Sequence, residues 1–236
     1  MTPINKEEAR RHMELLGRDL EQTIWQTWPD KKTKKGFPSV STDRNRLVSG
    51  VKEGGNAGFA LAHFPGKTLN GTAKRDVDFI RKKGGVYDVL AAEWDDGSSL
   101  EEQRDRIREA QLPDPSLCVF TGGKSHHHYW LLDDPISMDE FCDYQVRLAQ
   151  ALGSDDTITT GDQILRVAGF PHSATGELAR IVFPAEGTKA DRYSIEEFSD
   201  LPELVIEKAP DLTGVITAPV TDLSDAVRLY LFPVAE

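Results

Sequence analysis

The sequence predicts an α+β fold in which helices cover one face of a mixed sheet. Short apolar segments typical of buried strands are interleaved with segments whose apolar residues recur every three or four positions, as in amphipathic helices. The order of these segments lacks the regular β-α-β repeat of a doubly wound parallel sheet. Two strand-like segments, residues 117–121 and 126–132, are joined by a short turn and are typical of a hairpin.

The first 50 residues are predicted to form a helix and a basic loop. Apolar residues between Met13 and Trp25 recur at helical spacing, so we expect an amphipathic helix within residues 6–27. Lysine, glycine and proline then interrupt the pattern over residues 29–41, which indicates a loop.

Residues 51–200 are predicted to form the main domain. Strands are expected at residues 59–64, 86–94, 117–121, 126–132, 164–167 and 179–183. Helices are expected at residues 73–83, from Ser99 up to Pro113, and from Ser137 to Gly153. The last two begin with the Ser-x-x-Glu pattern of a capping box. Residues 201–236 are expected to be an acidic tail or the start of a further region.

Composition narrows the class of protein. No apolar run approaches the roughly 18 residues that a membrane span needs, and the N-terminus lacks a secretory signal, so we expect a cytoplasmic protein with no membrane partner. The two cysteines, Cys118 and Cys142, exclude a disulfide framework. The net charge of −11 argues against indiscriminate coating of nucleic acid, although basic residues concentrate within residues 31–46 and 74–83.

Two carboxylates lie at the end of the predicted strand 86–94, one on Glu93 within it and one on Asp95 directly after it. Glu93 and Asp95 share one face because strand side chains alternate, whereas Trp94 points to the other face. Carboxylates about 7 Å apart on one face suit a pair of divalent cations that polarise a phosphate and activate an attacking hydroxyl. The alternative is an acidic turn in which Asp95 or Asp96 prepares the bend at the following glycine.

A dense polar segment, TGGKSHHHYW, joins the strands of the predicted hairpin. Its glycines let the backbone approach an anion, and Lys124, Ser125 and histidine supply donors for phosphate oxygens. Ser125 and His127 would lie on one face and His126 and His128 on the other, so Ser125 and His127 are the predicted triphosphate ligands. The alternative is a polar turn followed by surface or core histidines. A histidine zinc site is disfavoured because consecutive strand residues diverge.

A third polar group follows the helix that Gly153 ends. Asp155 and Asp156 come directly after it, and Arg166 lies on the strand predicted over residues 164–167. A carboxylate here would supply a third metal ligand, and the arginine would supply a cation for a phosphate. A helix stop followed by a turn is the alternative interpretation.

The ordered set of these motifs, EWDDG from Glu93, TGGKSHHHYW and LRVAG from Leu165, resembles the archaeo-eukaryotic primase superfamily. The likeness is closest to plasmid- and phage-type primase-polymerases and covers residues 57–184. It implies a sheet like that of an RNA-recognition motif, with helices, joined to a smaller αβ module. Residues 51–200 would then be a catalytic primase-polymerase domain.

The resemblance also implies roles for individual residues. Glu93, Asp95 and Asp155 match the catalytic, metal-binding carboxylates, with Asp96, Asp156 and Asp162 as less favoured ligands. The nucleotide-binding residues would be Lys124, Ser125, His127 and Arg166. Around Arg166 the sequence departs from the family pattern, because Ala168 stands where proline is usual and His172 where asparagine is common.

The resulting hypothesis is a DNA primase or primase-polymerase. It would transfer nucleotides from ribo- or deoxyribonucleoside triphosphates along a single-stranded DNA template, with two Mg²⁺ or Mn²⁺ ions as cofactors. A helicase, fused or separate, would be a partner, although this chain carries no Walker motif. Two alternatives are a rolling-circle or mobilisation endonuclease using His-x-His and Tyr144, and an inactive nucleotide- or DNA-binding module of a replication protein.

Overall fold

The computed structural model describes residues 2–20, 22–67, 69 and 74–202. The chain divides into two compact units, Met1–Leu204 and Val205–Glu236, and the second lies outside the described residues. The tail or further region expected over residues 201–236 therefore also lies outside them, apart from its first two residues.

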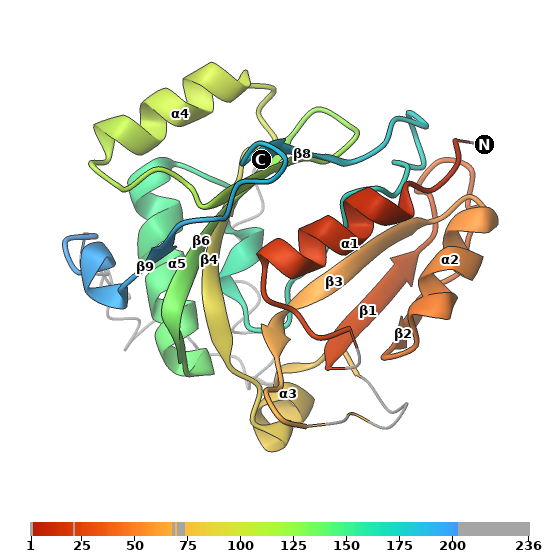
Figure 1. The fold of residues 1–236 in the computed structure, drawn as a ribbon, viewed down its shortest axis with the longest axis horizontal. Helices are drawn as coiled ribbons and strands as arrows, with labels where there is room; N and C mark the ends of the chain where they lie inside the picture. The colour runs from red at the N-terminus through yellow and green to blue at the C-terminus, as the bar shows by residue number, and fades with distance from the viewer. Residues whose placement is uncertain (1, 21, 68, 70–73, 203–236) are drawn as a thin grey trace, which may run out of the picture. The chain divides into compact units, whose positions relative to one another are not determined.

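The described unit contains two sheets, so the α+β fold class is confirmed, although the strands do not form one sheet. In one sheet the order is β2 (Ser39–Ser41), β1 (Thr23–Trp28), β3 (Asn56–His63) and β7 (Ile164–Arg166). In the other it is β4 (Tyr87–Glu93), β6 (His126–Ile136), β5 (Leu117–Phe120) and β8 (Arg180–Phe183), with β9 (Arg192–Tyr193) parallel to β6. We call these the β3 sheet and the β6 sheet (Figure 1).

The helices begin and end where local chemistry requires. They are α1 (Lys6–Leu15), α2 (Arg44–Lys52), α3 (Val77–Lys83), α4 (Leu100–Glu109) and α5 (Met138–Leu152), with 3₁₀ turns η1 (Asp156–Thr159) and η2 (Ile195–Phe198). Both predicted capping boxes are present, at Ser99 and Ser137, and α5 ends at left-handed Gly153. None of the described helices is long and apolar enough to cross a membrane.

The helix predicted within residues 6–27 is wrong in its second half. The chain leaves the helix after Leu15 and turns at Gly17, whose φ is 66°. Residues 23–28, Thr-Ile-Trp-Gln-Thr-Trp, then form β1, because β-branched and aromatic side chains fit the pleated surface beside β3. Sequence analysis also missed β2, whose three residues end the loop predicted over residues 29–41, as well as α2 and β9, and it placed the end of β6 too early, at Leu132. Residues 23–28 and 39–41 therefore belong to the same sheet as β3, as strands β1 and β2.

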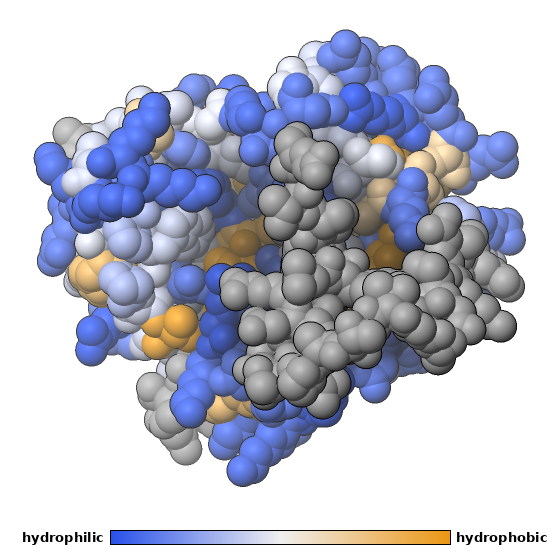
Figure 2. All heavy atoms as spheres, turned by 180° about the vertical axis from the view of Figure 1, so that it is seen from behind, coloured by the Kyte–Doolittle hydropathy of each residue, from blue (hydrophilic) through white to orange (hydrophobic). Residues whose placement is uncertain are grey.

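Apolar side chains fill the interior between these elements. Tyr87 stacks on Phe141 of α5 with ring centroids 4.0 Å apart, and both rings are fully buried. Cys118 is buried and Cys142 half-buried, and both are free thiols. The surface seen in Figure 2 is mostly hydrophilic, as expected when most large apolar side chains are buried in the core.

A buried ionic cluster lies where the two sheets meet. The strands β3 and β4 are joined by the bridge between His63 and Val86. Beside it, the Arg18 guanidinium lies 2.8 Å from the Asp88 carboxylate, which His63 Nδ1 also approaches at 3.3 Å. Arg18 donates a further hydrogen bond to the carbonyl of Leu61 in β3. Burial opposes ionisation of Asp88, but the hydrogen bond from His63 and the charge of Arg18 hold its pKa below the usual value.

We expect Asp88→Asn to destabilise the fold by about 3 kcal/mol at pH 7, because it leaves the buried Arg18 without a countercharge. The folded-state pKa of Asp88 lies below the unfolded value, so its stabilisation is present at neutral pH and disappears as pH falls through the folded-state pKa. Urea unfolding at several pH values measures this. Asp139→Asn, in an exposed pair with Arg81, is the control and should change stability by less than about 0.5 kcal/mol. Equal losses in the two variants would contradict this account.

Candidate active site

The site is built where β4 ends beside the start of β6. Glu93, the last residue of β4, is the register partner of His127 in β6. Ser125 Oγ donates a hydrogen bond of 2.6 Å to Glu93 Oε1, and His127 Nε2 lies 3.2 Å from Glu93 Oε2. The shared face predicted for Ser125 and His127 is therefore present, and it points at the first predicted carboxylate.

The Glu93 carboxylate is ionised although its side chain is only 21% exposed. Burial would raise its pKa, but the charge and hydrogen bond of His127, the Ser125 hydroxyl and the charge of Arg166 together lower it to about 2. A permanent negative charge is thus kept at the end of β4 at neutral pH.

Both ring nitrogens of His127 have partners inside the protein. Its Nδ1 lies 3.2 Å from the hydroxyl of Tyr129, and only 3% of the His127 side chain is exposed. Sequence analysis did not assign Tyr129 to the site, although the two-residue repeat 125, 127, 129 puts it on the same face as Ser125. In this state His127 can bind a phosphate oxygen only by releasing Glu93 or Tyr129.

The glycines of the turn before Ser125 are required by the chain's own packing. Gly122 has a φ of 80°, and a Cβ there would lie 2.5 Å from the carbonyl oxygen of Glu177. Thr175 Oγ1 donates a hydrogen bond of 2.5 Å to the Gly122 carbonyl, and His172 Nε2 would lie 3.2 Å from a Cβ at Gly123. The segment after β7 therefore supports the turn that carries Lys124 and Ser125.

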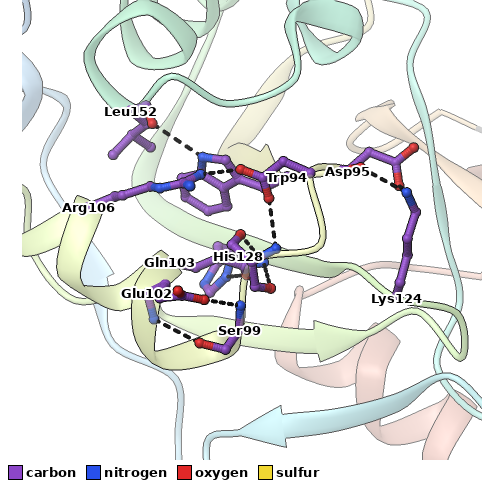
Figure 3. Close-up of polar contacts among 11 residues, drawn as sticks. Trp94, Asp95, Ser99, Glu102, Gln103, Arg106, Lys124, His128 and Leu152 are labelled. Atoms are coloured by element: carbon purple, nitrogen blue, oxygen red, sulfur yellow. Dashed lines mark hydrogen bonds and ion pairs between the residues drawn. The ribbon is translucent and has the colours of Figure 1, made fainter.

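Lys124 joins this turn to the second predicted carboxylate. Its Nζ lies 3.1 Å from Asp95 Oδ1 and donates a hydrogen bond of 2.8 Å to the Asp95 carbonyl. Figure 3 shows Lys124 reaching Asp95 on one side of the strand end, whereas Trp94 lies toward Arg106 and Leu152 on the other. Both side chains of the Lys124–Asp95 pair are mostly exposed, so solvent and ions can reach them.

The remaining predicted carboxylates differ in how they lie relative to Glu93. The Asp155 backbone N–H donates to the Glu93 carbonyl at 2.8 Å, while its side chain caps η1 through Thr157. Asp96 pairs with Arg106 of α4 at 2.7 Å, and Asp162 lies 3.6 Å from Arg75. Asp156 is exposed within η1. The structure thus brings the Asp155 backbone to Glu93, and the Asp96 and Asp162 side chains have other partners.

Arg166, at the end of β7, interacts electrostatically with Glu93 from the other sheet. Burial lowers the pKa of its guanidinium to about 10, and the charge of Glu93 opposes that shift. Its Nη1 donates a hydrogen bond of 2.7 Å to Asn56 Oδ1, and the guanidinium lies 5.2 Å from the centre of the Trp28 ring. The site therefore combines residues of both sheets.

The carboxylates fit a hard divalent cation in their chemistry, but they are not arranged as a closed ligand set. Within the described part of the chain, no three His, Cys, Asp or Glu side chains gather closely enough to hold a metal ion. The donors are nevertheless carboxylate oxygens at the ends of adjoining segments, and Glu93 is already ionised. Asp95 would have to leave Lys124, and Asp155 would have to leave its cap on η1, to join Glu93.

The other face of β6 has a structural role. The His128 Nε2 lies 2.8 Å from Gln103 Oε1, and burial lowers the pKa of His128 to about 3. Its ring also packs edge-on against Trp94. Tyr144 of α5 packs against the core and under the Arg147 guanidinium. These contacts give no support to a His-x-His and tyrosine endonuclease.

Comparison with solved structures relates this fold to primases. The chain matches the archaeo-eukaryotic primase (AEP) domain of the primase-polymerase of cyanophage S-2L with a TM-score of 0.69 and 25% identity, over 84% of this chain and 98% of that chain. The chain has an archaeo-eukaryotic-type primase core. The catalytic domain of primase RepB′, solved with initiator DNA, matches the primase core with a TM-score of 0.52 and 14% identity, over 78% of this chain and 86% of that one. No protein-family model and no curated protein matches the chain.

One departure of the primase core from the family pattern has a local cause. The backbone N–H of Ala168 donates a hydrogen bond of 3.0 Å to His12 Nδ1 in α1. Proline has no N–H and would leave the buried His12 without this donor. The segment that follows Arg166 is therefore tied to α1, whose N-cap Asn5 also donates through its backbone to the Gly169 carbonyl at 2.8 Å.

We expect Gly122→Ala to destabilise the primase core by about 3 kcal/mol, because left-handed backbone strain adds to a steric clash with the Glu177 carbonyl. Gly97→Ala is the matched control. Gly97 has a φ of 81°, but a Cβ there meets nothing within 4 Å, so only the strain of about 1 kcal/mol should remain. Urea unfolding of both variants tests this, and equal losses would show that the close approach of Glu177 is not what requires a glycine.

Proposed function

We propose that the protein is a primase-polymerase that transfers nucleotides from nucleoside triphosphates to a growing strand on a DNA template. The observation that carries the proposal is the ionised Glu93 carboxylate, held by Ser125 and His127 beside the Lys124–Asp95 pair. It combines an acidic centre with phosphate-binding donors on one strand face. The likeness to the cyanophage primase-polymerase domain supports the same chemistry at the level of the fold.

Two divalent cations, Mg²⁺ or Mn²⁺, are the proposed cofactors. Glu93, Asp95 and Asp155 would hold them, and when bound they supply Lewis-acid activation of the attacking hydroxyl and of the phosphate. The exposed Lys124 can give up Asp95 to a cation because a surface ion pair contributes little free energy. Freed from Asp95, the Lys124 ammonium becomes available to the triphosphate.

The chain's own residues would then hold the nucleotide in line for attack. Ser125 and His127, turned from Glu93, would bind the β- and γ-phosphates together with Lys124. The 3′-hydroxyl of the growing strand attacks the α-phosphate, the new phosphodiester bond forms, and pyrophosphate leaves. Arg166 would stabilise the negative charge that develops on the phosphoryl oxygens.

Single-stranded DNA is the proposed template. The likeness to RepB′, whose catalytic domain was solved with initiator DNA, supports this assignment. The lysines at positions 31, 32, 34 and 35 follow β1 in a turn capped by Asp30 and would contact backbone phosphates. A helicase, fused or separate, is the proposed partner in replication, and the protein would act in the cytoplasm.

We expect Asp95→Ala to lose about a thousandfold in nucleotide addition, because it removes a proposed metal ligand. It should unfold at the same temperature as the wild type, because the Asp95 side chain is mostly exposed. The measurement is extension of a labelled primer on single-stranded DNA, with each sugar type of nucleotide. Asp105→Ala, which removes an exposed carboxylate on α4, is the control and should retain activity. Full activity in Asp95→Ala would refute the assignment.

Removal of divalent ions should abolish extension. We expect no product in EDTA and recovery when Mg²⁺ or Mn²⁺ is added in excess, because the carboxylates alone leave the phosphate unneutralised. Extension that persists in EDTA would contradict a metal-dependent mechanism.

A covalent tyrosyl–DNA adduct lost in Tyr144→Phe would instead support the endonuclease, and DNA binding without turnover would support an inactive module.

A further inference from the structure

The guanidinium of Arg166 contacts one side chain of β1 and one side chain of β3. The Trp28 ring, on β1, lies 5.2 Å from the guanidinium carbon, and Asn56 Oδ1, on β3, accepts a hydrogen bond of 2.7 Å from Nη1. Trp28 and Asn56 are register partners in neighbouring strands. The flat face of the ring and the amide oxygen thus constrain the guanidinium in two different directions.

A glycine makes this arrangement possible. Gly58 lies on β3 between the two strands, as register partner of Gln26 in β1 and of Arg166 in β7. A Cβ at Gly58 would lie 3.0 Å from Cζ3 of Trp28 and 2.6 Å from the carbonyl oxygen of Leu165. The absence of a side chain therefore lets both β7 and the Trp28 ring lie close to β3 at this point.

Asn56 is itself held in place from the other side. Its Oδ1 also accepts a hydrogen bond of 3.2 Å from the backbone N–H of Ser173, and Ser173 Oγ donates to Asp30 Oδ2 at 2.9 Å. Asn56 and Asp30 are buried, 3% and 4% exposed. Hydrogen bonds from the Thr33 backbone and side chain, with that of Ser173, lower the pKa of Asp30 to about 2, so it remains an acceptor at neutral pH.

We propose that Trp28 and Asn56 are positioning residues that aim Arg166 at the reacting phosphate. This rests on the proposed function. An arginine side chain has many rotamers, and fixing its fork in advance removes that entropy from the catalytic step. Asn56 is neutral, so it orients the guanidinium without neutralising it. The positive charge then stays available to the transition state, in which a carboxylate at position 56 would compete with the phosphoryl oxygens.

The first experiment is a double-mutant cycle on primer extension with Mn²⁺. We expect Trp28→Leu to lower kcat about tenfold with little change in KM, and Trp28→Phe to stay within about threefold because the ring face remains. In an Arg166→Met background the same Trp28→Leu change should cost less than about twofold, since Trp28 would act through the arginine. Equal losses in both backgrounds would overturn the positioning role.

A substitution at Asn56 tests separately the orientation of Arg166 and its charge. Asn56→Asp keeps the acceptor and the shape, so the thermal midpoint should not fall, yet kcat should drop by about tenfold because the new carboxylate neutralises Arg166. In the Arg166→Met background this substitution should have a smaller effect on kcat. An Asn56→Asp variant with wild-type kcat and wild-type stability would contradict the proposed electrostatic role.

The placement of the Arg166 guanidinium against Trp28 can also be tested without measuring turnover. In ¹⁵N-labelled protein, the Arg166 Nε–H signal, assigned by its loss in Arg166→Met, should be shifted by the Trp28 ring current. Trp28→Leu should return it toward the position of a free arginine. An unshifted wild-type signal overturns the proposal whether or not the protein extends primers. If the signal is shifted and the wild type extends no primer with either metal, the proposed function is refuted, whereas the placement of Arg166 against Trp28 is confirmed.

Discussion

Burying an ionised carboxylate at the end of a strand is unfavourable unless donors surround it. Glu93 meets this requirement only because β4 and β6 pair in the register that sets it opposite His127. A shift of one residue would turn Ser125 and His127 to the opposite face and leave the carboxylate unpaired. The pairing of β5 with β6 and the hydrogen bond from Thr175 to the glycine turn support the turn that carries Ser125 and the start of β6 that carries His127.

The second sheet contributes through charge. Arg166 and Glu93 interact across the space between the sheets, and the ionic cluster of Arg18 with Asp88 holds the two sheets together at β3 and β4. The N-terminal helix adds a further constraint through His12 and Ala168. Segments far apart in the sequence thus determine where the site residues lie.

Alternation along single strands was enough to predict part of the site. It identified the common face of Ser125 and His127 and the opposite face for His128. The capping boxes in turn identified the starts of α4 and α5, because they too depend on residues only a few positions apart. Trp28 and Asn56 could not be predicted as neighbours of Arg166. Their contacts depend on the pairing of β1, β3 and β7, which lie more than a hundred residues apart at the extremes.

The same limit explains the errors. Ile24 and Trp25 fit a helical repeat as well as a strand, and only the pairing of β1 with β3 decides between them. The approach of Glu177 and His172 to the glycines at 122 and 123 is likewise a long-range contact, which the local sequence pattern does not contain.

The room that Gly58 leaves for Trp28 has an evolutionary consequence. A relative that keeps a large aromatic residue at position 28 cannot accept a side chain at position 58 without moving the ring from the arginine. A small residue at position 28 would remove only the contact with the ring, because a Cβ at position 58 would still lie 2.6 Å from the carbonyl oxygen of Leu165. A glycine at position 58 should therefore be retained across related sequences whichever residue stands at position 28, and an aromatic residue at 28 should occur only together with it.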